Sequence, residues 1–468
     1  MTQDIAKAQD FLSTAAESSS VVDAEFVSAI SDLLRTGKPG VLRNILDNLH
    51  AADIASLITE LHADLRCDLL YLLPLDERAD VFGYLDPDIQ VEVGRALGRA
   101  EFAKIVSEMS ADERVDLFNH LPHDQQQALL PALAQAERED IRKLSSYPEG
   151  TAGAVMTSDY ASLPPHLTAR QALEQLRLAA PDKETIYNAY VVDDARRLLG
   201  VVSLRDLIVA EADTRVDEIM DTHVIRARAE DGQEDVARII SKYDLFALPI
   251  INGGDALVGI VTQDDAMDVA EEEATEDFHK SGTVTPLATS LKEAGIGLLY
   301  RKRISWLVVL VFFNIFSGAG LALFQDTIVA HVALVFFLPL LIAGGGNAGA
   351  QASTLMVRAL ATGDVHLTDW GKMLGRELLV ATGLGLTMAV AVAGIGIVRG
   401  GPDIAMIVSA TMVLVVIVGS VIGMSLPFLL SRFNLDPASA SSPLITSIAD
   451  VAGVIIYLGI ATAVLSHG

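Results

Sequence analysis

The chain has 468 residues, of which 51% are hydrophobic, and a formal net charge of −27, so it is long enough for several domains. Residues 1–300 hold 26 Lys and Arg against 54 Asp and Glu, whereas residues 301–468 are apolar and nearly neutral. This acidity argues against nucleic-acid binding and suits domains that collect cations, and the single cysteine, Cys67, excludes both an intramolecular disulfide framework and a zinc-ligand spacing.

The N-terminal segment, residues 1–40, is predicted to be an extension that precedes the first domain. Its first residues, MTQDIAKAQD, have neither the basic start nor the apolar core of a signal peptide. We therefore expect the acidic N-terminal half of the chain to remain in the cytoplasm.

Residues 41–150 contain an internal repeat of twelve residues and are predicted to form a helical domain. Turn-and-cap sequences such as LPLDER at Leu73 and MSADER at Met109 follow several of the repeated positions. Short helices of about two turns, each begun by Asp or Ser, would stack into a superhelical α-solenoid, and an ordinary helical bundle is the alternative. Neither carries a catalytic signature. The repeated residues are Leu49, Leu61, Leu73, Leu85, Leu97, Met109, Leu121 and Leu133.

Residues 151–270 contain two copies of one α/β pattern. VMTSDYASLPPHLTARQALEQL is echoed by IMDTHVIRARAEDGQEDVARII, and YVVDDARRLLGVVSLRDLI by LPIINGGDALVGIVTQDDAM. Each copy predicts a helix, two strands, and then Asp206 or Asp265 at the start of a further helix. The pair resembles tandem cystathionine-β-synthase-type (CBS) domains, most clearly in LLGVVSLRDLI and LVGIVTQDDAM. This resemblance implies a regulatory module of a kind that often binds adenine nucleotides, so ATP is the cofactor that it suggests.

Residues 271–300 are predicted to be a connecting helix region, and the most acidic stretch of the chain leads into it. This stretch, DDAMDVAEEEATED from Asp264 to Asp277, has eight acids among fourteen residues. Charges at this density repel along a helix unless cations neutralise them. A solvated helix face is the ordinary interpretation, but a position between a regulatory pair and a membrane domain favours a divalent-cation switch.

Residues 301–468 are predicted to form an all-α membrane domain with five spans, because five uncharged stretches are long enough to cross a bilayer. With the N-terminal half in the cytoplasm, seven Lys and Arg flank the spans inside and only Arg399 flanks them outside. The positive-inside rule then places the C-terminus outside. The five stretches are roughly 304–325, 327–357, 378–398, 404–430 and 437–466.

The second span contains GGGNAGAQASTLMVR, in which three consecutive glycines weaken the helix and let another backbone approach closely. Asn347, Gln351 and Thr354 follow at spacings that put their polar side chains on one face. From these residues alone, a tight helix contact joined by polar side chains and the lining of a pore are about equally favoured.

The last span contains Asp450 in an otherwise uncharged stretch, where a carboxylate costs about 2.5–3.5 kcal/mol on insertion scales. No intramembrane Lys or Arg is available as its partner. Either a proton neutralises it, which indicates a proton relay, or a cation does, above all if a symmetric dimer brings two copies together. Asp450, Thr446 and loosened carbonyls offer oxygen ligands to a hard cation, and the lack of His and Cys in these spans disfavours zinc or copper.

The chain as a whole is a multidomain membrane protein that resembles the MgtE family of bacterial magnesium channels. The order of domains matches, and the most specific segments are GGGNAGAQASTLMVRALATGDV, LDPASASSPLITSIADVAGVIIY and AEEEATEDFHKSGTV. The resemblance implies a homodimer in the inner (plasma) membrane, with one pore between the protomers lined by the second and fifth spans. It implies that Asp450 of both chains binds partly hydrated Mg²⁺. The pore-lining positions that match are Gly346, Asn347, Gln351 and Thr446.

The resemblance also implies regulatory Mg²⁺ sites between the helical domain, the CBS pair and the connecting helix. Mg²⁺ that bridges these acidic faces would hold the domains packed and the pore closed, and its loss would let them separate by repulsion. The transported ion would then report its own concentration. The matching acids are Asp265, Asp268, Glu273, Glu276 and Asp277, with Asp244, Asp436, Asp112 and Asp116 as further candidates.

The same residues leave three alternatives to a channel. An enzyme is disfavoured because the HExxH and GxxxxGK[ST] motifs are both absent. The main rival is a secondary transporter in which Asp450 alternates between a proton or sodium ion and the divalent cation. A membrane-tethered sensor whose partner transports the ion is the third, but it leaves Asp450 unexplained.

Overall fold

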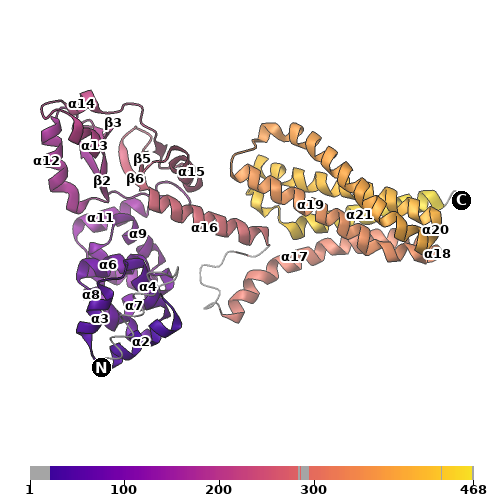
Figure 1. The fold of residues 1–468 in the computed structure, drawn as a ribbon, viewed down its shortest axis with the longest axis horizontal. Helices are drawn as coiled ribbons and strands as arrows, with labels where there is room; N and C mark the ends of the chain where they lie inside the picture. The colour runs from indigo at the N-terminus through magenta and orange to yellow at the C-terminus, as the bar shows by residue number, and fades with distance from the viewer. Residues whose placement is uncertain (1–21, 283–284, 286–294, 434, 466–468) are drawn as a thin grey trace. The chain divides into compact units, whose positions relative to one another are not determined.

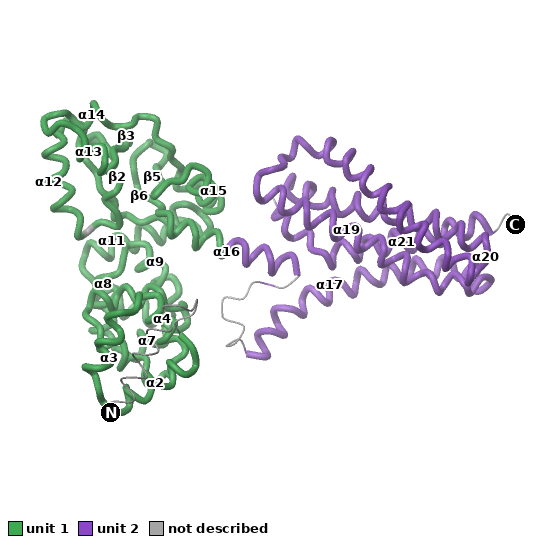
Figure 2. The backbone as a smooth tube through the Cα atoms, in the orientation of Figure 1, with its two compact units in different colours: residues 1–271 green, residues 272–468 purple. Residues whose placement is uncertain are grey.

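The structure is a computed structural model that describes residues 22–282, 285, 295–433 and 435–465. The chain divides into two compact units, Met1–Glu271 and Glu272–Gly468, which Figure 2 shows in different colours. Residues 1–21 of the predicted N-terminal extension and most of residues 283–294 of the predicted connecting region lie outside the described residues.

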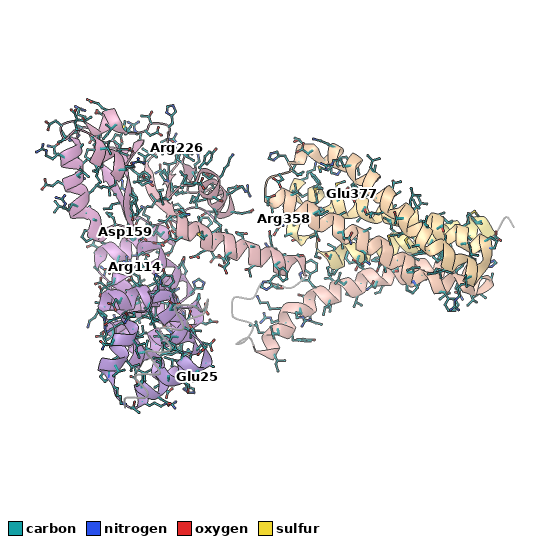
Figure 3. The ribbon with its side chains drawn as sticks, in the orientation of Figure 1. Glu25, Arg114, Asp159, Arg226, Arg358 and Glu377 are labelled. Atoms are coloured by element: carbon teal, nitrogen blue, oxygen red, sulfur yellow. The ribbon has the colours of Figure 1, made fainter. Side chains whose placement is uncertain are left out.

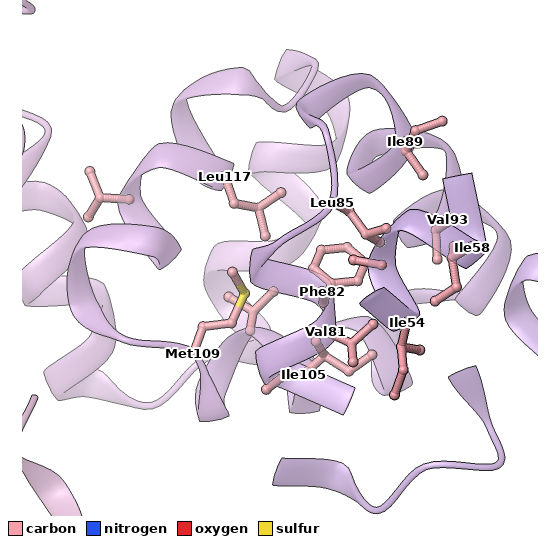
Figure 4. Packing of buried hydrophobic residues seen from close by; sticks show 14 of the residues in the cluster. Ile54, Ile58, Val81, Phe82, Leu85, Ile89, Val93, Ile105, Met109 and Leu117 are labelled. Carbon is pink, nitrogen blue, oxygen red and sulfur yellow. The ribbon is translucent and has the colours of Figure 1, made fainter. Parts of the chain in front are cut away.

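The first unit begins with a helical domain, at the indigo end of Figure 1. Each twelve-residue repeat position from Leu61 to Leu133 is buried at the junction between one helix and the next. Figure 4 shows part of the resulting core around Phe82. Phe26 joins this core, so part of the predicted N-terminal extension belongs to the helical domain. The elements are α2 (Ala24–Arg35), α3 (Pro39–Leu46), α4 (Ala51–Glu60), α5 (Ala63–Leu70), α6 (Leu75–Gly83), α7 (Pro87–Leu97), α8 (Arg99–Glu108), α9 (Ala111–His120), α10 (His123–Leu129), η1 (Leu130–Ala132) and α11 (Gln135–Leu144).

A second pattern with the same period, absent from our predictions, ties neighbouring helices together. The guanidinium of Arg66 donates to the carbonyl of Leu61, and Arg78 and Arg114 donate to the equivalent carbonyls of their own repeats. The amide of Gln90 donates to a carbonyl at the end of the preceding helix in the same way. These bonds satisfy carbonyls that helix C-termini leave unpaired. The predicted Asp and Ser caps are not the rule, because His, Pro, Gly and Ala stand at most of the cap positions.

Two α/β repeats follow, in the order of elements predicted for a CBS pair. In each repeat a helix precedes two antiparallel strands, and a further helix begins where the second strand ends. A short strand pairs in parallel with the first strand of each hairpin, which completes a three-stranded sheet. The elements are β1 (Tyr160–Leu163), α12 (Ala169–Ala179), η2 (Ala180–Asp182), β2 (Thr185–Val192), β3 (Leu198–Ser203), α13 (Leu204–Val209), α14 (Val216–Ile219), β4 (Ala227–Arg228), α15 (Gln233–Tyr243), β5 (Ala247–Ile251), β6 (Leu257–Thr262) and α16 (Gln263–Ser281).

The second unit contains four helices long and apolar enough to cross a membrane among the described residues, rather than the five predicted. The difference lies in α20 (Trp370–Arg432), where Gly401 has a positive φ of 81° and interrupts the helix. The chain doubles back there, since the hydroxyl of Ser409 donates to the carbonyl of Ala389, and the two legs contain the predicted third and fourth spans. The other elements are α17 (Ile296–Leu323), α18 (Gln325–Ala330), η3 (Val332–Phe337), α19 (Leu338–Ala361), η4 (Leu367–Asp369), η5 (Pro437–Ser439) and α21 (Ser442–Leu465).

Glycines hold α19 against the second leg of α20. A Cβ atom added to Gly423 would clash with the carbonyl oxygen of Gly349, and one added to Gly419 would clash with that of Gly345. Backbones approach this closely only where both helices lack a side chain. The glycine run of the second span therefore makes the tight helix contact that was one of its two interpretations.

Replacing Gly423 with alanine is expected to destabilise the membrane unit by about 1–3 kcal/mol, because the new methyl group must displace the backbone of α19. The matched control is Gly394→Ala in the first leg, where an added Cβ has no atom within 4 Å. The measurement is the midpoint of thermal unfolding of the purified protein in detergent. Equal shifts for the two variants would contradict close packing at Gly423.

Candidate functional site

Helices α19 and α21 bring the predicted pore residues Gly346 and Thr446 together. A Cβ atom added to Gly346 would lie 2.8 Å from Cγ2 of Thr446. The glycine face of α19 is buried, whereas Asn347 and Gln351 on the same helix are exposed in the single chain. One helix thus supplies both the tight contact and the exposed polar face that the sequence left as alternatives.

Asp450 lies one turn beyond Thr446 on α21. It is partly exposed, and its Oδ1 atom has no hydrogen-bond partner among the described residues. The same helix is anchored further along, where the hydroxyl of Tyr457 donates to the carbonyl of Leu334 at 2.9 Å. An unpaired carboxylate on a membrane helix is costly unless a cation, a proton or a second copy of the chain completes its surroundings.

In the first unit, Asp112 of α9 and Asp265 of α16 belong to one acidic cluster, although they come from different domains. Asp112 is 9% exposed, and its Oδ1 atom has no hydrogen-bond partner in the described part of the chain. Thr262 Oγ1 donates to Asp265 Oδ2 at 2.6 Å and orients that carboxylate. Burial raises the pKa of Asp112, and the charge of Asp159, labelled in Figure 3, raises it further.

Burial and mutual repulsion raise the pKa values of the acids in this cluster. The pKa of Asp265 rises to about 7, first because of burial and then because of the charge of Asp112. The same two causes raise the pKa of Glu113 to about 7 and that of Glu184 to about 8. Carboxylates that repel one another in this way are stabilised when a cation is bound among them.

The cluster is not a preformed cage, because no three acidic, histidine or cysteine side chains converge on a metal position within the described ranges. Mg²⁺ does not need one, since it keeps several waters and is commonly held by one or two carboxylates. The sequence did not reveal Glu113 or Glu184. Glu113 adjoins Asp112 inside an ordinary helix, and Glu184 precedes a strand without any motif.

The other predicted acids of the first unit are exposed. Asp116 lies on α9, one turn beyond Asp112. Asp244 ends α15 in the left-handed conformation, with φ of 50°, where a short polar residue is tolerated. Asp268 lies on α16, and partial burial of its carboxyl group and the charge of Asp264 raise its pKa.

In the second unit, Lys280 near the end of α16 holds two of the predicted acids. Its Nζ atom lies 2.8 Å from Glu276 and 2.6 Å from Asp436. Glu273 and Asp277 are partly buried on the same helix. A lysine ammonium therefore lies between two carboxylates that are predicted metal ligands, and no sequence motif marks it as their partner.

Without Mg²⁺, the protein is expected to become more stable as the pH falls from about 8 to about 5.5. The raised pKa values of Asp265 and Glu184 mean that the folded state binds protons in this range that the unfolded chain does not bind. This stabilisation is complete below the ordinary carboxyl pKa near 4 and is lost as the pH rises through about 8. The measurement is the unfolding temperature in a chelator, and Asp112→Asn is expected to flatten its pH dependence. A rise in stability with pH would contradict the cluster.

The two CBS repeats present matching aromatic side chains. Tyr187 on β2 and Phe246 just before β5 are 68% and 64% exposed, and their ring centroids lie 6.0 Å apart. Asn188, next to Tyr187, pairs in register with Ser203, and the hydroxyl of Ser203 is bonded to Asp206. Exposed rings near a carboxylate can stack on a base and accept hydrogen bonds from a ribose.

Three family models match the chain. The model described as "Divalent cation transporter" (MgtE) matches residues 338–460, "MgtE intracellular N domain" matches 49–150, and "CBS domain" matches 152–213 and 216–272. The matches fall on the membrane helices, the helical domain and the two α/β repeats in turn.

Similar proteins cover almost the whole length. "Magnesium transporter MgtE" of Thermus thermophilus is 38% identical over 447 residues, which is 95% of this chain and 99% of the relative. The protein of that name from Bacillus subtilis is 33% identical and covers 94% of this chain and 97% of its own. A solved structure described as the cytosolic domain of the Mg²⁺ channel MgtE in complex with ATP is 39% identical, with a TM-score of 0.50 over 51% of this chain and 99% of that one.

Proposed function

The chain belongs to the MgtE family of magnesium transporters, and we propose that it is a Mg²⁺-selective channel for magnesium uptake that closes when cytosolic Mg²⁺ is high. The family transports divalent cations and is not a family of enzymes. A relative described as a Mg²⁺ channel supports a channel rather than a carrier.

The unpaired carboxylate of Asp450 carries the proposal. In a homodimer, two copies would face each other across a two-fold axis and offer two carboxylates to one ion. Thr446 on the same helix and the exposed Asn347 and Gln351 of α19 would add neutral oxygens around it. Mg²⁺ dehydrates reluctantly, so such a pore would hold it with several of its waters.

The homodimer is proposed to lie in the plasma membrane with its N-terminal half in the cytoplasm and its C-terminus outside. The Lys and Arg that flank the membrane helices support this orientation. The CBS pair would supply a second contact between protomers. Ile208 of α13 and Met267 of α16 are 65% and 66% exposed at equivalent positions of the two repeats, as expected for an apolar surface that a partner covers.

Gating is proposed to arise in the cluster of Asp112 and Asp265. Mg²⁺ bound there would join the helical domain to the start of α16 and would offset the burial and the repulsion between carboxylates that raise both pKa values. Helix α16 continues from Asp265 to the acids near Lys280, so a change at one end is carried along a single helix. Because Mg²⁺ would bind the closed arrangement preferentially, rising cytosolic Mg²⁺ would shift the population toward it.

ATP is proposed to bind the CBS pair beside Tyr187, with Asp206 accepting hydrogen bonds from the ribose. The ATP complex of the 39% identical cytosolic domain and the exposed aromatic pair support this site.

The variant Tyr187→Ala is expected to weaken ATP binding about tenfold, because it removes a stacking surface. Titration calorimetry of the purified protein with ATP measures the effect. Tyr84→Ala, which removes an exposed ring from the helical domain, is the control and should leave the affinity unchanged. Unchanged binding in Tyr187→Ala would place the nucleotide elsewhere.

A secondary transporter coupled to protons or sodium is the alternative, because a proton could also neutralise Asp450. The two functions differ in proteoliposomes that contain the purified chain. A channel takes up Mg²⁺ down its own gradient after the proton and sodium gradients have been collapsed. Uptake that stops when those gradients are removed would instead identify a coupled transporter.

A further inference from the structure

Both ends of α20, near Trp370 and Arg432, border a cavity of about 670 Å³ that plays no part in the proposed ion pathway. It lies between the two ends of α20, the η4 turn and α21. Its walls are mainly apolar and include Trp370, Leu429 and Ile448. This size is typical of cavities that take a ligand rather than a few waters.

The polar groups around the cavity are few and one of them is a cation. Thr368 and Ser425 contribute hydroxyl groups, and Arg432 contributes a guanidinium. Arg432 is exposed and has no ion-pair partner among the residues that the structure describes. Trp370 is 43% exposed, and tryptophan side chains gather where a membrane meets water. The cavity therefore has mainly apolar walls and one cation at its rim, and an exposed tryptophan there is as expected near a membrane surface.

We propose that this cavity binds an anionic phospholipid, with the phosphate on Arg432 and an acyl chain against the apolar walls between the two legs of α20. Lys372 and Arg376 at the same end of the first leg are matched in number by Asp369 and Glu377, so Arg432 supplies the excess positive charge there. A free anion would use Arg432 but leave the apolar walls in water, whereas a phospholipid covers both. A second copy of the chain would have to bring its own carboxylate to Arg432.

The bound lipid would contact the pore helix from behind. Ile448 lines the cavity and precedes Asp450 by two residues on α21, so the lipid and the proposed ion site touch different faces of one helix. An anionic lipid would then stabilise the position of α21. This inference requires membrane embedding but does not rest on gating by cytosolic Mg²⁺.

Native mass spectrometry of the full chain in detergent tests the site, with phosphatidylglycerol, phosphatidylcholine and inorganic phosphate as probes. We expect phosphatidylglycerol to be retained in preference to the other two. Arg432→Gln is expected to weaken its retention about tenfold, because it removes a charge-assisted contact. Ser425→Phe, whose larger side chain would fill the cavity, is expected to abolish retention of phosphatidylglycerol. Arg399→Gln, beside the Gly401 break and away from the cavity, is the matched control and should bind like the wild type.

Three results would overturn the proposal. Equal retention of phosphatidylglycerol by the wild type and Arg432→Gln would show that the guanidinium does not bind the lipid. Because Arg432 is exposed, this variant is expected to fold like the wild type. Equal retention of phosphatidylcholine would remove the preference for an anionic headgroup. A disulfide between two chains formed efficiently by Leu429→Cys would show that a second copy covers the cavity instead.

Discussion

The variant Asp450→Asn is expected to abolish Mg²⁺ flux, with a loss of at least about a hundredfold. The substitution keeps the shape of the side chain but removes its charge, and in a homodimer it removes two charges from one ion site. The Oδ1 atom that has no hydrogen-bond partner in the described structure is the group we expect the ion to contact. The measurement is Mg²⁺ uptake into proteoliposomes that contain a magnesium-sensitive dye.

The control for this variant is Asp403→Asn. Asp403 is exposed beside the Gly401 break, on the second leg of α20, and its loss should leave the flux near the wild-type value. Comparable flux through Asp450→Asn and the wild type would show that the ion takes another route through the membrane unit.

The variant Asp112→Asn is expected to shift closure of the pore to cytosolic Mg²⁺ concentrations at least about tenfold higher. The substitution removes one carboxylate from a proposed Mg²⁺ ligand pair and relieves the repulsion that the ion would otherwise relieve. Binding of Mg²⁺ then lowers the free energy of the closed state by less than in the wild type. The measurement is the Mg²⁺ concentration at the cytosolic face that halves the flux.

Asp124→Asn is the control for this second variant, because Asp124 is an exposed acid on α10 of the same helical domain and is not among the candidate Mg²⁺ ligands. It should leave the half-closing concentration unchanged. If both variants moved that concentration equally, general acidity of the helical domain rather than the Asp112 cluster would control the pore.

The helical domain was largely predictable because its core repeats with a fixed period. The twelve-residue spacing of Leu61, Leu85 and their equivalents marks the helix junctions directly. The role of the equally regular Arg66, Arg78 and Arg114 could not be predicted, because their partners are backbone carbonyls, which have no signature in a sequence. The prediction of Asp and Ser caps failed at most helix starts, where His, Pro, Gly or Ala stands instead.

The membrane unit was predictable in its apolar stretches but not in their division. Hydropathy falls around Arg399 and Asp403, which indicates a gap between two spans. In the structure the gap is only the break at Gly401, a glycine with positive φ, and both legs lie within α20. The glycines at 349 and 423 meet across two helices that are far apart in sequence, and no local pattern identifies such a pair.

The acidic cluster was predictable only in part. Asp265 could be identified from its place after a CBS strand, and its structural partner Thr262 is visible in the same segment. The proximity of Asp112 to Asp265 depends on how the helical domain contacts the CBS pair, which a single sequence does not encode locally. Glu184 joins the cluster through the same contact.

Single-channel recording from the reconstituted protein, while Mg²⁺ at the cytosolic face is raised, tests the central claim most directly. A self-regulated channel predicts discrete unitary Mg²⁺ currents whose open probability falls as cytosolic Mg²⁺ rises, and no currents in Asp450→Asn. Silent patches from a preparation that still takes up Mg²⁺ in exchange for protons or sodium would contradict it.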